Sequence, residues 1–318
     1  MRNLTKEYRG GVKANDGISL TVDGGEVFGL FGHNGAGKTT LLNQIAGLTL
    51  PTSGSIRVDG HDPVADPATA RGLCSLQPQA NAPLDGITPR QAIETLARIR
   101  GARRDRARER AAELIAALEL EEWADKPGDR LSGGVRRLTA FCMAAAMPGR
   151  LVMFDEPTND VDPLRRRLLW GQIRALAGGG CAVILVTHNV IEAERGVDRL
   201  VVLDRGRVLA RGTPAQLRGV HSDRLRLELV AVDEAGARRL AEDFAAGWQV
   251  APVVSGRRVV AQIAPSAASA ALGWAQGWRD SGQVDEFSVT PTSLEDVYLA
   301  LVGGSGMEGA ESDASLVA

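Results

Sequence analysis

The chain has 318 residues, of which 44% are hydrophobic, and a formal net charge of −2. This length suits two domains, and the composition is that of a folded globular protein with a substantial core. The near-neutral charge excludes a general electrostatic attraction to nucleic acid or to an anionic membrane.

The cysteines and the apolar segments indicate in which compartment the protein works and whether it crosses a membrane. The three cysteines lie far apart in apolar stretches, so we expect reduced thiols in a cytosolic protein. No segment approaches the roughly 18 consecutive apolar residues that a membrane-spanning helix needs, and residues 1–6 contain no apolar signal sequence. We therefore expect any role at a membrane to be carried out from outside the bilayer.

The first predicted elements enclose a glycine-rich loop. Residues 18–22 and 26–31 favour strands, and residues 38–47 favour a helix. Between them, residues 32–40 read GHNGAGKTT and match the pattern G-x-x-x-x-G-K-[ST]. Strand, glycine loop and helix in this order are the setting in which the pattern forms a phosphate-binding loop. A glycine turn with an incidental lysine is the less favoured alternative.

This loop predicts a nucleotide-binding protein. Its glycines let the backbone turn tightly and bring N–H groups against phosphate oxygens. Lys38 can reach the β- and γ-phosphates, and the hydroxyl of Thr39 can bind Mg²⁺. The helix that starts at Lys38 adds the positive end of its dipole. The predicted nucleotide-binding residues of the loop are Gly32, His33, Asn34, Gly35, Ala36, Gly37, Lys38, Thr39 and Thr40.

A helical region follows two short predicted strands at 55–59 and 73–77. Residues 89–147 show helical periodicity without a convincing strand, which predicts a helical subdomain. Acidic residues interleave with the arginines of its segment 98–110. A solvated helix face with ion pairs is therefore favoured there over a nucleic-acid or lipid-binding patch.

Apolar runs predict the rest of the first domain. Residues 151–154 and 182–186 are apolar throughout, as are strands of a parallel sheet that is covered on both faces. Residues 163–177 begin with a proline, which suits the first turn of a helix. The remaining predicted elements of this domain are strands at 200–203 and 208–210 and a closing helix at 213–218.

A second pattern begins near residue 224. Its order of strand, helix, strand, strand, helix, strand and a last helix fits a ferredoxin-like unit. We therefore predict a nucleotide-binding domain at 1–219, a small accessory α+β domain at 220–302 and a disordered tail at 303–318. The predicted elements of the accessory domain lie at 225–230, 233–246, 250–254, 259–263, 266–280, 284–289 and 293–302.

Two acidic residues follow the apolar strand at 151–154. Asp155, at the carboxyl end of this strand, can hold Mg²⁺ mostly through water, and Glu156 can polarise an attacking water. Upstream, a serine and two glycines at 132–134 open a predicted helix, whose free N–H groups and dipole can bind an anion. Ordinary helix capping by the serine is the alternative, and it would be favoured if this segment stood alone.

Together these motifs resemble the ATPase subunit of ATP-binding-cassette (ABC) transporters over residues 1 to about 218. The phosphate loop, the segment 131–134 (called the signature segment from here on) and the acidic pair Asp155 and Glu156 have the order and spacing of that family. The resemblance implies an α/β P-loop NTPase fold with a helical subdomain, with ATP and Mg²⁺ as cofactors. It also implies that one chain forms half a site, completed by a second ATPase subunit in a homodimer.

The same resemblance assigns roles to single residues. Tyr8 matches the aromatic residue that stacks on adenine, although a surface tyrosine is an alternative. Gln79, in preference to Gln77, matches the glutamine that touches Mg²⁺ and senses the membrane partner. His188 matches the histidine that contacts the γ-phosphate, and Asp162 matches the loop that meets the opposite subunit. The predicted site comprises catalytic Glu156 and His188, metal-binding Thr39, Gln79 and Asp155, and, besides the loop, nucleotide-binding Tyr8, Gln79, Ser132, Gly133, Gly134 and Asp162.

Three positions depart from the family pattern. Val135 stands where the signature usually has glutamine, and His33 stands where proline or an acidic residue is more usual. Asp160 replaces a customary glycine. None of these changes removes a residue assigned to catalysis, so the resemblance implies a subunit that hydrolyses ATP.

The end of the chain narrows the expected function. Residues 292–299, TSLEDVYL, resemble the ending of ATPase subunits of daunorubicin-resistance-type exporters, although an amphipathic helix capped by Ser293 would also account for them. We therefore expect an ATPase that powers export of a drug, antibiotic or lipid-like cargo through a separate transmembrane permease, at the cytoplasmic face of the cell membrane and without nucleic acid. The alternative is a non-transport ABC ATPase that acts in translation or DNA maintenance.

Overall fold

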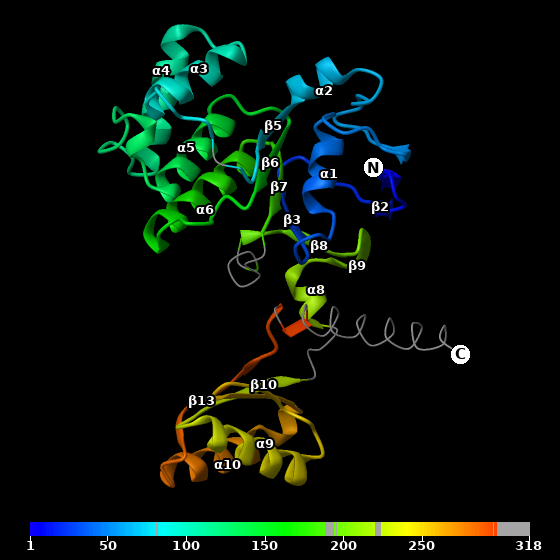
Figure 1. Ribbon diagram of the computed structural model, residues 1–318, viewed down its shortest axis with the longest axis vertical. Coiled ribbons are helices and arrows are strands. Elements are labelled where there is room, and N and C mark those ends of the chain that lie inside the picture. The colour runs from blue at the N-terminus through cyan, green and yellow to red at the C-terminus, as the bar shows by residue number, and fades with distance from the viewer. Residues whose placement is uncertain (81, 188–193, 195, 220–223, 295, 298–318) are drawn as a thin grey trace. The chain divides into compact units, whose positions relative to one another are not determined.

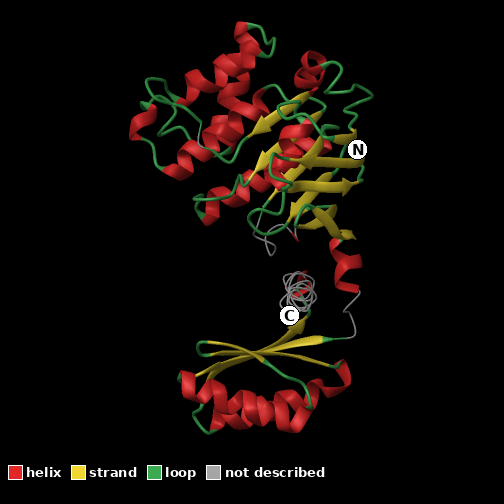
Figure 2. Cartoon of the chain, turned by 45° about the vertical axis from the view of Figure 1, so that its right-hand side comes forward, coloured by secondary structure: helices red, strands yellow, loops and turns green. Residues whose placement is uncertain are grey.

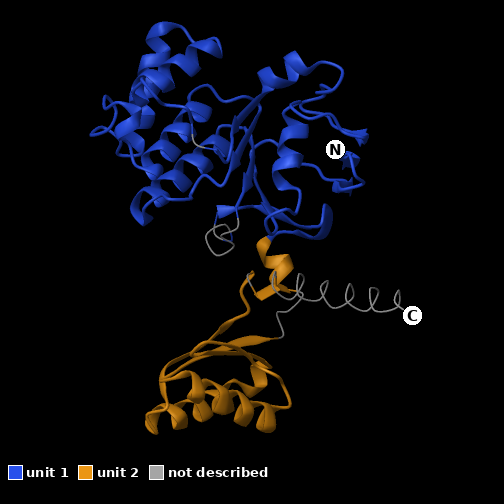
Figure 3. Cartoon of the chain, viewed as in Figure 1, with its two compact units in different colours: residues 1–213 blue, residues 214–318 orange. Residues whose placement is uncertain are grey.

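The structure, a computed structural model, describes residues 1–80, 82–187, 194, 196–219, 224–294 and 296–297 (Figure 1). The chain divides into two compact units, residues 1–213 and 214–318 (Figure 3). The sequence analysis used a helix at 213–218 to close the first domain. In the structure that helix, α8 (Pro214–Gly219), groups with the second unit instead. The predicted tail at 303–318 lies outside the described residues.

A six-stranded sheet in the order β5-β6-β7-β3-β8-β9 forms the centre of the first unit. All neighbouring strands run parallel except β8 and β9, which are antiparallel. The strands β3, β6 and β7 are almost entirely buried, as their uninterrupted apolar runs predict. The strands are β3 (Val27–Phe31), β5 (Cys74–Gln77), β6 (Leu151–Asp155), β7 (Ala182–Val186), β8 (Arg199–Asp204) and β9 (Arg207–Gly212).

A smaller sheet in the order β2-β1-β4 corrects two predicted strands. β1 spans Arg2–Glu7, β2 spans Lys13–Ile18 and β4 spans Ser53–Ser55. The strand predicted at 18–22 is therefore wrong, because the chain pairs through the polar residues before Ile18, which carry no apolar alternation. The strand predicted at 55–59 also fails. Its apolar residues Ile56 and Val58 are buried, but Ser55 belongs to the end of β4, and Val58 forms an isolated bridge with His61 across a turn.

Helices flank the central sheet and build the helical subdomain (Figures 1 and 2). The segment predicted as helical contains α3, α4 and α5, and a capping box formed by Thr88 and Gln91 starts α3. The short helix α2 was not predicted. It is capped by Asp66, whose side chain accepts a hydrogen bond from the Thr69 N–H. The helices are α1 (Lys38–Ile45), α2 (Pro67–Leu73), α3 (Pro89–Ile99), α4 (Arg104–Ala117), α5 (Gly133–Ala146) and α6 (Pro163–Gly178), with a 3-10 turn at Gly128–Arg130.

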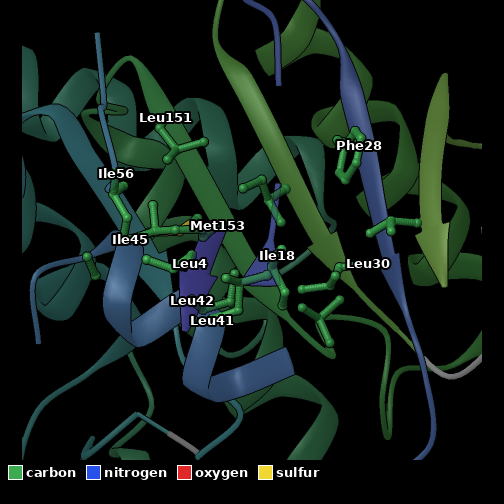
Figure 4. Close-up of a cluster of buried hydrophobic side chains, with 14 of the residues drawn as sticks. Leu4, Ile18, Phe28, Leu30, Leu41, Leu42, Ile45, Ile56, Leu151 and Met153 are labelled. Atoms are coloured by element: carbon green, nitrogen blue, oxygen red, sulfur yellow. The ribbon is translucent and has the colours of Figure 1, made fainter. Parts of the chain in front are cut away.

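A hydrophobic cluster fixes α1 against the sheet (Figure 4). Leu41, Leu42 and Ile45 of α1 are buried against residues of β3, β6 and β7 and against Leu4 and Ile18 of the small sheet. Burial of each such side chain contributes about 1.5–3 kcal/mol. Because α1 begins directly after the glycine loop, this cluster also fixes the position of the loop.

The second unit has the predicted ferredoxin-like order. Its four strands form an antiparallel sheet in the order β11-β12-β10-β13, and α9 and α10 cover one face (Figure 2). The last predicted helix, 293–302, lies mostly outside the described residues. None of the helices in the described segments has the length and hydrophobicity to cross a membrane. The elements are β10 (Leu225–Ala231), α9 (Glu234–Trp248), β11 (Val253–Ser255), β12 (Arg258–Ile263), α10 (Ala268–Asp280) and β13 (Val284–Pro291), with a 3-10 turn at Pro265–Ala267.

Candidate nucleotide-binding site

The glycine loop leaves β3 and enters α1 under tight steric constraint. Gly37 has φ +97°, and a Cβ atom there would lie 2.0 Å from the carbonyl oxygen of Ala14. At Gly32 a Cβ atom would lie 2.4 Å from the carbonyl oxygen of Leu203. Both positions therefore require glycine, which leaves the loop backbone free to face a ligand.

Lys38 carries a positive charge into the centre of the loop. Its Nζ donates hydrogen bonds to the carbonyl oxygens of Gly32 (2.6 Å) and His33 (2.8 Å). Burial lowers the pKa of Lys38, and the carboxylates of Glu156 and Asp155 partly oppose this effect. A buried cation whose hydrogen bonds go to neutral carbonyl groups is well placed to bind an anion such as a phosphate.

Asp155 ends β6 beside the start of α1. Thr39 Oγ1 donates a hydrogen bond of 2.9 Å to Asp155 Oδ2, and the Asp155 side chain is buried. Burial raises the pKa of Asp155. The Thr39 hydrogen bond, Lys38 and Arg137 lower it, while Glu156 raises it further. The net upward shift means that the ionised carboxylate is undercompensated, which a bound cation would correct.

Glu156 has an unusual backbone conformation. Its φ is +54°, in the left-handed region that non-glycine residues rarely adopt. Its N–H donates to the carbonyl oxygen of Val186 on the neighbouring strand (2.9 Å), which holds this conformation. Such conformations cost about 1–3 kcal/mol and persist where the surrounding structure fixes them, often at functional sites.

One pocket gathers these groups. It brings residues of the glycine loop, the three metal-binding candidates and Glu156 together. His33, Gly32 and Ala36 belong to the loop without lining this pocket. The lining residues are Ala14, Asn34, Gly35, Gly37, Lys38, Thr39, Thr40, Gln79, Asp155 and Glu156.

Several predicted residues lie apart from this pocket. Tyr8 is 45% exposed, and its ring centroid lies 5.0 Å from Lys6 Nζ. Ser132 caps α5 by accepting a hydrogen bond from the Val135 N–H (3.4 Å). Asp162 caps α6 by accepting from the Arg165 N–H (3.0 Å). His188 lies outside the described residues. None of the described residues that line this pocket comes from the signature segment.

The signature segment packs against the loop that follows Glu156. A Cβ atom at Gly134 would lie 2.4 Å from the carbonyl oxygen of Asp160, so the start of α5 requires glycine at this position. Asp160 itself has φ +61°, which explains why glycine is customary there. Val135 is buried, so an apolar side chain suits its position at the start of the signature helix.

The sequence analysis missed three residues that support the glycine loop, namely Asn15, Gln44 and Asp204. Asn15 is fully buried, and its Nδ2 donates to the carbonyl oxygen of Gly37 (3.1 Å). Gln44 Nε2 donates in turn to Asn15 Oδ1 (2.6 Å). His33 Nε2 donates to Asp204 Oδ1 (2.6 Å) at the end of β8. A polar Gln44 within the apolar face of α1 was the one available signal.

The fold and the site define an ATP-binding ATPase of the P-loop class. The family model described as "ABC transporter" matches residues 15–159. The chain is 34% identical to the daunorubicin/doxorubicin resistance ATP-binding protein DrrA of Streptomyces peucetius, over 94% of this chain and 91% of the relative. It is 32% identical to the Nod factor export ATP-binding protein I of Burkholderia orbicola, over 95% of this chain and 96% of the relative.

A solved structure agrees with these relatives. A dimeric ATP-binding cassette in a post-hydrolysis state with ADP and Pi bound matches with a TM-score of 0.61 and 26% identity. The match covers 67% of this chain and 97% of that one. The chain therefore belongs to the ATP-binding proteins of ABC transporters, among those of the drug-exporter type. It binds ATP and is an ATPase.

Proposed function

We propose that this protein hydrolyses ATP as one of two identical subunits that drive export through a separate membrane permease. The observation that supports this most directly is the separation within one chain of the phosphate pocket from the exposed start of α5. A helix start with free N–H groups suits the phosphates of a nucleotide held by another subunit. Two copies would then complete two sites.

Within the pocket each residue has a distinct proposed role. Lys38 and the loop N–H groups neutralise and hold the phosphates of ATP. Glu156 polarises the water that attacks the γ-phosphate, a task that requires a carboxylate fixed close to the phosphate. Its strained backbone, locked to Val186, supplies that fixed position. Tyr8, which lies apart from this pocket, and His188, which lies outside the described residues, keep their predicted roles at adenine and at the γ-phosphate.

The pocket also fits Mg²⁺. Thr39, Asp155 and Gln79 offer a hydroxyl, a carboxylate and an amide, which are the oxygen donors that Mg²⁺ prefers. The buried carboxylate of Asp155, whose pKa is raised, is the group that gains most from a cation. When bound, Mg²⁺ would neutralise charge on the β- and γ-phosphates.

The proposed cargo follows from the named relatives. These are a drug-resistance protein and a Nod factor exporter, so a drug, antibiotic or lipid-like compound is the proposed cargo class. The permease would place the ATPase at the cytoplasmic face of the membrane. Because the site lies in the ATPase and the cargo path in the permease, no residue of this chain is proposed to select the cargo.

Affinity purification tests the partner. A tagged Glu156→Gln variant, expected to hold ATP without turnover, is purified with ATP from detergent-solubilised membranes of the native cell, and co-purifying proteins are identified by mass spectrometry. The proposal expects a protein with several transmembrane helices in stoichiometric amount. Recovery of ribosomes or DNA-repair complexes in its place would favour the non-transport alternative.

A further inference from the structure

Arg137 joins the signature helix to the pocket and has no role assigned so far. It lies on α5, about one turn after the signature segment 131–134, and only 6% of the residue is exposed. Its Nη1 donates a hydrogen bond to the backbone carbonyl oxygen of Gln79. Its own carbonyl oxygen accepts a longer one from Gln77 Nε2 (3.4 Å). Both ends of the residue therefore contact the segment that carries Gln79.

The topology places this contact beside the metal-binding candidates. β5 runs parallel to β6 with Gln77, its last residue, opposite Phe154. Gln79 follows two residues later and therefore lies at the edge of the sheet where Asp155 ends β6. The ring of Phe141, one turn after Arg137 on α5, stacks on Phe154 with centroids 4.8 Å apart. α5 is thereby fixed to β6, the strand that ends at Asp155, and the guanidinium is fixed at the backbone carbonyl of Gln79.

Packing alone does not require an arginine at position 137. Removing a guanidinium from water is costly, and a buried ion is often replaced by an apolar side chain without loss of stability. Within the part of the chain that the structure describes, Arg137 Nε has no hydrogen-bond partner. The guanidinium therefore places a buried positive charge at the Gln79 carbonyl, and this charge also acts electrostatically on the Asp155 carboxylate.

We propose that Arg137 is a positioning residue for ATP hydrolysis, which sets the Gln79 loop beside Asp155 and so controls how well the pocket binds a magnesium–nucleotide complex. This inference rests on the proposed function, because it takes Gln79 and Asp155 as metal-binding residues. It also links the start of α5, proposed to face ATP on the second subunit, with the metal side of the same chain's own pocket.

A binding measurement tests this role separately from activity. The Kd of a fluorescent ATP analogue is measured in EDTA and in Mg²⁺, and the ratio of the two values reports how much the metal tightens binding. For Arg137→Met we expect the Kd in EDTA to stay within about twofold of wild type. We expect the Mg²⁺-dependent tightening to fall about tenfold, the scale of one lost hydrogen bond to a charged group, and kcat to fall with it.

Two further variants complete the experiment. Arg136→Met is the matched control, because Arg136 is the neighbouring arginine on α5 and faces Asp85 instead (Nη1 to Oδ1 3.7 Å). It should leave both Kd values and kcat within about twofold. Arg137→Lys keeps the charge without the planar fork and should give an intermediate Mg²⁺ effect.

The outcomes are distinct. Unchanged Mg²⁺-dependent tightening and kcat in folded Arg137→Met overturn the inference, and so does a lower Tm as its only change. If Arg137→Met does not fold, wild-type values in Arg137→Lys overturn it. A wild-type protein that binds the analogue equally in EDTA and in Mg²⁺ contradicts the metal role in the proposed function itself.

Discussion

Replacing Lys38 separates the contribution of the phosphate loop to binding from its contribution to folding. In the structure Nζ is enclosed by two carbonyl oxygens at 2.6 and 2.8 Å and is buried. In Lys38→Ala these carbonyl groups lose a donor, which destabilises the fold. The variant also removes a buried charge, as the lowered pKa of Lys38 indicates, which stabilises it. The two effects oppose each other, so we expect little change in Tm.

ATP binding has no such compensation. A hydrogen bond to a charged group contributes about 1.5–3 kcal/mol. Loss of the Lys38 contact to the phosphates should therefore raise the Kd for ATP roughly 10- to 150-fold. Lys38→Arg should not restore affinity, because the planar guanidinium is wider than the ammonium group that the two carbonyl oxygens enclose.

Nucleotide titration by fluorescence or calorimetry measures this effect, with thermal unfolding recorded in parallel. Lys126→Ala is the matched control, since Lys126 is an exposed lysine paired with Glu122. Exposed pairs contribute only about 0–1 kcal/mol, so both Kd and Tm should stay near wild type. A wild-type Kd in Lys38→Ala, or a fold lost in that variant alone, would refute the reasoning.

Three other variants test separate parts of the account. Asp155→Asn removes a buried carboxyl whose pKa is raised. The protonated carboxyl stabilises the folded state at low pH, and this stabilisation is lost as the pH rises through the pKa that the group has in the folded protein. The substitution should therefore stabilise the nucleotide-free protein by about 0.5–2 kcal/mol near pH 7 while abolishing Mg²⁺-dependent ATPase activity; a lower Tm would count against this. Asp160→Gly relieves a left-handed conformation beside the start of α5, so phosphate-release assays should show activity at or above wild type, and a severe loss would contradict it. A chain ended after Thr213 should still fold and bind ATP by circular dichroism and titration, whereas failure to fold would show that the two units depend on each other.

Elements with a strong periodic pattern could be predicted from the sequence. The uninterrupted apolar runs of β6 and β7 predicted buried parallel strands, and the pattern at 32–40 predicted a glycine loop between a strand and a helix, as β3 and α1 show. Strands β1 and β2 of the small sheet carry no such pattern, because backbone pairing between β1 and its neighbours β2 and β4 forms this sheet and polar residues can take part in it. The short helix α2 depends on its cap at Asp66 more than on an apolar face.

The buttresses of the site could not be predicted for a different reason. Asn15 supports Gly37 and Arg137 supports Gln79 through contacts between segments far apart in the sequence. Sequence patterns describe single elements, whereas these contacts depend on how β2 and α5 are placed around the central sheet. Asp204 likewise reaches His33 only because β8 lies next to β3.

Glu156→Gln tests the central claim, which is that this chain carries half of an ATP-hydrolysing site completed by a second copy. The substitution keeps the shape of the side chain and removes the carboxylate that polarises water. We expect turnover to fall by about 10²- to 10⁴-fold while ATP binding remains.

The decisive measurement is the molar mass of Glu156→Gln by light scattering after size exclusion, with ATP and with ADP. The account predicts a dimer with ATP, a monomer with ADP, and a monomer in both when Lys38→Ala is added to block binding. Near wild-type hydrolysis by Glu156→Gln, or a monomer that binds ATP without dimerising, would contradict it.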